Sequence, residues 1–171
     1  VKVRQKAKPV QLQTIVDVGR FGATPDDGQN DADALRQAAA YCRLHPGTTL
    51  TFSPGTYDFR DEEAVRIERE AISGAYGEDV QGRLFQPKGP YVKGLNFNGC
   101  RRLTIKAYGA TLLMQGWYEV LSFQKAHDIN IEGLTITYKR PASTLGPIVT
   151  STDEYFDFRI DPKKYCYMDS I

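Results

Sequence analysis

The side chains in this chain best suited to acid–base chemistry are carboxylates that lie close together in the sequence. Three sets stand out: Asp61 and Glu62, Asp128 and Glu132, and Asp153 and Glu154. Two carboxyl groups can hydrolyse a glycosidic bond when they flank it at a separation of roughly 5 Å or 6.5–9.5 Å. None of the three sets has a recognisable catalytic motif around it, so each also has a structural interpretation.

Two of these sets have structural interpretations that follow from their surroundings. Asp128 precedes a predicted strand, and an internal repeat matches it to Arg102, which predicts an ion pair between neighbouring strands. Asp153 and Glu154 lie between two predicted strands and fit the solvated tip of a hairpin.

A cluster of four aspartates near the N-terminus is a candidate for binding a hard cation. Its members are Asp26, Asp27, Asp31 and Asp33. Carboxylate oxygens suit calcium, but the glutamate that closes a calcium-binding loop is missing. Turn formation and helix capping explain the same residues. We therefore predict neither a metal site nor a cofactor.

Trp117 and Tyr118 are the candidate substrate-binding residues. They follow Gly116 in a predicted loop, and exposed aromatic rings there can stack on the faces of sugars. The alternative is that both rings pack against a neighbouring loop or module.

Composition excludes several classes of protein. The net charge of +1 gives no reason to expect nucleic acid or an anionic membrane as a partner, and no apolar run approaches the roughly 20 residues that span a bilayer. Cys42, Cys100 and Cys166 form no CxxC pair and are odd in number, which favours buried free thiols. His45 and His127 are isolated and fit surface or turn positions.

An internal repeat between Leu95 and Tyr138 gives the clearest information about the fold. Its two copies match at a constant offset of 26 positions: Leu95 with Leu121, Phe97 with Phe123, Cys100 with Ala126, Leu103 with Ile129, and Ile105 with Ile131. Apolar and polar residues alternate within each copy, as in strands. Short strands repeated at a fixed period predict a coil of parallel strands, a β-helix.

The segments around the repeat predict further elements. We expect a strand at 14–18, a helix that begins after Asn30 or Asp31 and runs to about Leu44, and strands at 49–53 and 57–59. Residues 60–90 read as a degenerate first turn of the coil, with a short strand at 64–67. Residues 146–150 and 155–160 predict an antiparallel hairpin.

These elements predict three regions: an N-terminal arm (1–13), capped coil turns (14–140) and the start of an inserted β module (141–171). Two or three turns would leave the far end of the coil uncovered. We therefore expect the chain to be a fragment of a longer protein.

Two motifs resemble the N-terminal entry of the pectate-lyase-like right-handed parallel β-helix superfamily. The first is the block Phe21-Gly22-Ala23, Asp26-Asp27-Gly28 and Asp31, and the second is the turn Pro54-Gly55-Thr56-Tyr57. The resemblance implies an all-β fold whose first turn is covered by a capping α-helix. It does not imply one chemistry, because that superfamily contains glycosidases, lyases, epimerases and phage tailspikes.

Residues 98–114, 129–141 and 146–149 resemble the N-terminal part of bacterial family 110 glycoside hydrolases of the α-1,3-galactosidase type. The resemblance implies a β-barrel inserted into an early turn and catalytic carboxylates in later turns. We therefore assign no catalytic residue here and expect this fragment alone to be inactive. The implied parent is an extracellular or periplasmic enzyme that removes terminal α-galactosyl or related sugars from glycans.

Two other functions remain open at this stage. One is a noncatalytic glycan-binding or structural β-helix module of the tailspike or adhesin type. The other is a polysaccharide lyase or epimerase, although lyases of this fold commonly use calcium and no convincing calcium set is present.

Overall fold

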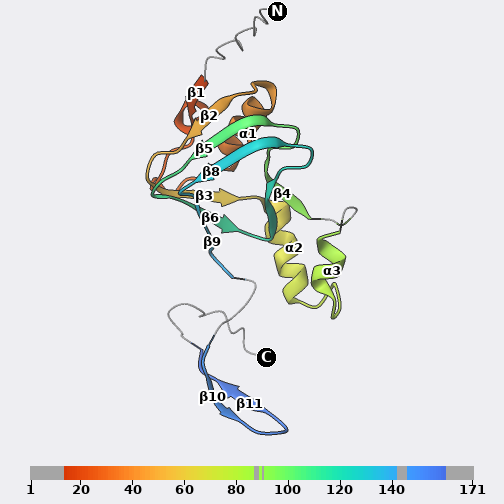
Figure 1. Ribbon diagram of the computed structural model, residues 1–171. Helices are drawn as coiled ribbons and strands as arrows, with labels where there is room; N and C mark the ends of the chain where they lie inside the picture. The colour runs from red at the N-terminus through yellow and green to blue at the C-terminus, as the bar shows by residue number, and fades with distance from the viewer. Residues whose placement is uncertain (1–13, 87–88, 90, 142–145, 161–171) are drawn as a thin grey trace, which may run out of the picture.

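Three parallel sheets dominate the computed structural model, which describes residues 14–86, 89, 91–141 and 146–160 (Figure 1). The predicted arm at 1–13 lies outside the described residues. One sheet has the order β1 (Thr14–Asp17), β2 (Thr48–Thr51), β5 (Arg101–Lys106), β8 (His127–Glu132). The second has β3 (Gly55–Arg60), β6 (Ala110–Gln115) and β9 (Thr135–Tyr138), and the third pairs β4 (Val92–Asn96) with β7 (Tyr118–Ser122). Successive strands from β4 to β9 therefore enter a different sheet each time.

The strand registers confirm that the two copies of the repeat pair in parallel. Leu95 lies beside Leu121, and Ile105 lies beside Ile131, each 26 positions later in the sequence. The rings of Phe97 and Phe123 stack with centroids 5.4 Å apart and planes 9° from parallel. Matching side chains of the two copies therefore form ladders across the sheets.

The predicted N-terminal helix is present as α1 (Ala32–Leu44), which follows the 3₁₀ turn η1 (Val18–Phe21). It packs against η1, β2, β3 and β4. Its buried residues include the predicted apolar face of Leu35, Ala38, Ala39 and Cys42. The Asp31 side chain precedes the helix without capping it, whereas the amide of Ala32 donates to Asn30 Oδ1 at 3.2 Å.

The prediction of a strand at 64–67 is wrong, because this segment belongs to the helix α2 (Glu62–Ile72). The Asp61 carboxylate accepts hydrogen bonds from the amides of Glu63 and Ala64 and so caps the helix. Ala64, Ile67 and Ala71 are buried at helical spacing. This periodicity extends over the whole segment and outweighs the local strand propensity of a β-branched residue.

A third helix, α3 (Val80–Leu84), follows α2 and shares a small core with it. The two helices lie between the first and second turns of strands. Leu50 of β2 consequently pairs with Ile105, 55 positions later, whereas the next step takes 26. The described part of the chain is therefore mostly β with parallel sheets and few helices, as the sequence predicted in outline, but α2 and α3 are helices that the sequence did not predict.

The predicted hairpin is present as β10 (Ile148–Ser151) and β11 (Phe156–Phe158), which pair antiparallel. The amide of Thr152 donates to the carbonyl of Tyr155 at 2.8 Å and closes the turn. Phe156 and Phe158 are exposed. Membership of an inserted module at 141–171 stays a prediction, since 142–145 and 161–171 lie outside the described residues.

Candidate functional site

The two aromatic residues predicted to bind substrate occupy different environments. Tyr118 is the first residue of β7 rather than a loop residue, and only 5% of it is exposed. Its hydroxyl donates to the carbonyl of Gln115, and its ring packs edge-on against Phe59. Burial raises the pKa of its phenol, with a smaller contribution from the charge of Asp61. Tyr118 thus joins the core.

Trp117 lies in the connection between β6 and β7 and is half-buried. It packs against the small core formed by Ile67, Ala71 and Leu84. Its amide donates to the carbonyl of Ala64 at 3.2 Å, which ties the connection to α2. A β-carbon on Gly116, where φ is 113°, would lie 2.6 Å from the Ala64 carbonyl carbon, so this contact requires glycine.

A cleft runs along α2 beside this connection. Two adjoining cavities of about 240 and 370 Å³ form it, and both are lined by Val65, Glu68 and Arg140. The cleft also contains Arg60 and Arg69. Among the described lining residues Glu68 is the one carboxylate, so the cleft is predominantly cationic.

Glu68 has the environment of a proton donor. Only 12% of its side chain is exposed, and its Oε1 lies 4.0 Å from Arg140 Nε. Burial raises the pKa of its carboxyl, and the charge of Arg140 offsets only part of this effect. A single carboxyl with a raised pKa can donate a proton, but hydrolysis by the usual two-carboxylate mechanism requires a second carboxyl group, and the described lining of this cleft does not contain one.

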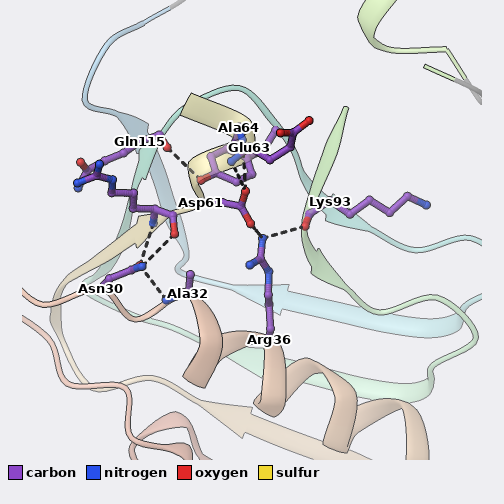
Figure 2. Close-up of polar contacts among 10 residues, drawn as sticks. Asn30, Ala32, Arg36, Asp61, Glu63, Ala64, Lys93 and Gln115 are labelled. Carbon is purple, nitrogen blue, oxygen red and sulfur yellow. Dashed lines mark hydrogen bonds and ion pairs between the residues drawn. The ribbon is translucent and has the colours of Figure 1, made fainter. Parts of the chain in front are cut away.

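A polar network joins α1 to the start of α2 (Figure 2). Arg36 reaches from α1 and donates to Asp61 Oδ2 at 2.7 Å and to the carbonyl of Lys93 at 3.5 Å. The Arg36 guanidinium also lies 5.2 Å from the centroid of the Phe59 ring. Burial alone would raise the pKa of Asp61, but the hydrogen bonds from Arg36 and from the α2 amides lower it. Asp61 is therefore an ionised structural group.

The N-terminal aspartates act as acceptors for backbone amides. Asp31 is buried, and its carboxylate accepts from the amides of Thr24 and Asp58, which fixes the turn before α1 against β3. Asp26 accepts from Thr56 in the Pro54–Tyr57 turn. Within the described ranges no three His, Cys, Asp or Glu side chains converge as a metal site would require.

The remaining carboxylates do not form catalytic pairs either. Arg102 and Asp128 both have left-handed backbone, with φ of 53° and 58°, and no ion pair joins these two described residues. The predicted ion pair between them is thus wrong, although the strand register keeps the two positions side by side. Glu132 accepts from Tyr108 and Asn130. Asp153 lies at the exposed hairpin turn, as predicted.

The cleft is not predicted by the sequence, because residues 60–90 read as a degenerate turn of strands. The helical spacing of Ala64, Ile67 and Ala71 is the signal in the sequence that indicates a helix here.

None of the helices in the described part of the chain is long and apolar enough to span a bilayer.

Comparisons with known proteins place this geometry in context. No protein-family model matches the chain. A protein of Bacteroides thetaiotaomicron named alpha-1,3-galactosidase B is 25% identical over 159 residues, which cover 93% of this chain and 24% of that protein. Alpha-1,3-galactosidase A of the same organism is 28% identical over 80% of this chain and 22% of its own length. Alpha-1,3-galactosidase A of Shewanella woodyi is 45% identical over 30% of this chain and 8% of its own length.

The chain thus spans about a quarter or less of the length of these curated relatives. Over most of its own length it is similar to proteins named alpha-1,3-galactosidase, and these similarities support a relationship to a glycoside hydrolase family.

Proposed function

We propose that this chain forms the first turns of a right-handed parallel β-helix in a secreted glycoside hydrolase that removes terminal α-galactosyl or related sugars from glycans. The observation that carries the proposal is the similarity of 93% of the chain to alpha-1,3-galactosidase B. The parallel registers of the three sheets support the β-helix, since β4–β7 and β5–β8 are offset by 26 positions and β6–β9 by 24.

The role of these residues in the proposed enzyme is to begin and support the coil. α1 covers the first turns, and Asp26, Asp31 and Asp61 hold turns and helices in place. Since the described carboxylates are used in this way or stand singly in clefts, we place the catalytic pair in a part of the enzyme beyond Ile171. The greater length of the relatives supports this placement.

Trp117 and Tyr118 keep a place in this proposal as a candidate sugar contact. Trp117 is half-buried and directly follows Gly116, which lines the α2 cleft, whereas Tyr118 belongs to the core. A sugar would therefore meet Trp117, and Tyr118 would hold the start of β7 in place.

The proposal is tested by measuring release of galactose from an α-1,3-linked galactobiose. We expect turnover by the longer gene product that contains these residues and none by the 171-residue chain. Turnover by the chain alone would contradict the placement of the catalytic pair. Failure of the longer product on every α-galactoside tried would contradict the proposed activity.

A further inference from the structure

A second cavity lies outside the α2 cleft, beside the two-stranded sheet of β4 and β7. It has a volume of about 500 Å³ and is lined by Phe85, Gly89, Tyr91, Lys93, Glu119 and Gln124. We call it the β4–β7 cavity. Its described lining residues all differ from those of the α2 cleft.

The polar side of this cavity contains a carboxylate oxygen that needs a donor. Lys93 and Glu119 are direct neighbours across the parallel strands, and Lys93 Nζ lies 3.9 Å from Glu119 Oε2. At that distance the two groups form an ion pair but are too far apart for a hydrogen bond. Glu119 Oε2 is buried and accepts no hydrogen bond within the described part of the protein. Buried polar atoms in native proteins nearly always have a partner, so this oxygen marks the place of a missing donor.

Two aromatic rings form the other side. Phe85 and Tyr91 have ring centroids 5.9 Å apart with planes inclined at 32°, and 41% of Phe85 is exposed. Their faces add an apolar surface to the lining that contains the carboxylate. Burial, the charge of Glu119 and a hydrogen bond to the Glu119 side chain raise the pKa of Tyr91, in that order, so its hydroxyl is engaged by this carboxylate and its ring is what it offers to a ligand.

The charges of the cavity select the class of ligand. Among the described lining residues one is a cation and one an anion, so their charges cancel and a strongly charged ligand gains little from them. A ligand with hydroxyl donors on one side and an apolar C–H face on the other matches both walls. A pyranose ring has this character, and its size fits a cavity of this volume.

Contacts of the backbone fix the position of β4 at Lys93. Arg36, which is fixed by Asp61, donates to the carbonyl of Lys93. Gly94, the next residue, lies so close to β7 that a β-carbon there would stand 2.7 Å from the carbonyl oxygen of Val120. β4 and β7 are therefore pressed together at this point, and the pair of Lys93 and Glu119 is set by the backbone.

We propose that the β4–β7 cavity is a noncatalytic subsite for a neutral pyranose unit of a glycan. A sugar hydroxyl donates to Glu119 Oε2, and the apolar face of the ring lies against Tyr91 and Phe85. The proposal rests on the proposed function only for the choice of galactosides as probes. A subsite of this kind would hold glycan near the enzyme without taking part in bond cleavage.

The test is titration of the 171-residue chain with methyl α-galactoside, followed by calorimetry and by NMR shifts of the cavity residues. Methyl α-glucoside and galacturonate serve as a neutral and a charged comparison. We expect saturable binding of the neutral sugars and weaker binding of galacturonate. Glu119→Gln and Tyr91→Ala should each weaken binding by about tenfold, because each removes one wall of the site.

The matched controls are Glu132→Gln and Tyr108→Ala, since this second pair of tyrosine and glutamate, hydrogen-bonded at 3.0 Å, lies outside the cavity. Tyr91→Phe, which retains the ring, should bind nearly as well as the original protein. Circular dichroism melting shows whether each variant is folded. Absence of saturable binding would mean that water alone satisfies Glu119 and would overturn the proposal. Equal loss in cavity and control variants would overturn it too. Failure of the galactose-release assay would leave this binding result unaffected.

Discussion

The two copies of the repeat have nearly the same pattern of residues but differ in how deeply their apolar side chains are buried. In the first copy Leu95, Phe97, Cys100, Leu103 and Ile105 are all buried. In the second copy the matching residues are only partly buried, and 39% of Ile131 is exposed. Ile105 and Ile131 are both isoleucines and lie side by side in adjacent parallel strands, so their different exposure comes from the residues around them.

The neighbouring elements account for this difference. β5 lies between β2 and β8, whereas β8 is the last strand described in its sheet. β4 has α1 packed against it, and no helix in the described part of the chain packs to that extent on β7. A repeat therefore determines which side chains point inward, but the next layer of structure determines whether they are removed from water.

The largest change in stability is expected when the two matched isoleucines are each replaced by alanine. Ile105→Ala should lower the free energy of unfolding by about 2–5 kcal/mol, because it leaves a cavity in the core. Ile131→Ala should cost about 1 kcal/mol or less, since its side chain is already partly hydrated. Urea denaturation followed by circular dichroism measures both. Equal losses would show that an element outside the described residues covers the second copy.

The small residues at matched positions sharpen the comparison. Cys100→Leu should cost about 1–3 kcal/mol, because a larger side chain overpacks a site that is 1% exposed. Ala126→Leu should be tolerated, since the partly buried second copy has room to adjust. Thermal unfolding of the two variants provides the measurement. A greater loss for Ala126→Leu would reverse the assigned order of packing.

The polar network at the covered end predicts a dependence on pH. The pKa of Asp61 in the folded protein is lowered from 3.8, so its contribution to stability is present above that pH and is lost as the pH falls through the folded pKa. Asp61→Asn should cost about 1–2 kcal/mol at pH 7, and the difference from the original protein should shrink below pH 4. Urea unfolding at pH 7, 5 and 3 checks this. The exposed neighbour Glu62→Gln is the control, and a difference that persists at pH 3 would contradict the assignment.

The last prediction concerns the reactivity of the buried thiols of Cys42 and Cys100, and its expected effect on stability is the smallest. Burial, together with the nearby Cys100, raises the pKa of Cys42 to about 12, and burial also raises the pKa of Cys100. Both should react with iodoacetamide more than about 100-fold slower in the folded protein than after unfolding. A cysteine introduced by Ala126→Cys should react faster than Cys100, as mass spectrometry of labelled peptides would show. Rapid labelling of Cys100 would mean that the first copy is open.

Several parts of this structure were determined by local sequence. The alternation of apolar residues and the constant offset of 26 positions fixed the parallel pairing of β4 with β7 and of β5 with β8. Helical spacing from Leu35 to Cys42 fixed α1, and strand pairs around Ser151–Glu154 fixed the hairpin. The burial of Cys42 and Cys100 followed from their isolation in the sequence. Each of these signals lies within a short segment or a simple repeat, so it can be read without knowing the fold.

Other features were decided only by the tertiary structure. Tyr118 and Trp117 are adjacent, but Tyr118 meets Phe59 while Trp117 meets α2, and no local signal separates their environments. Likewise Glu119 and Lys93 lie far apart in the sequence, and the parallel register brings them together at the β4–β7 cavity. The alternation of apolar residues in the sequence determined which side chains of the repeat point inward. Burial and electrostatic pairing depend on residues from distant segments, so the packing of the sheets determined the partners of those side chains.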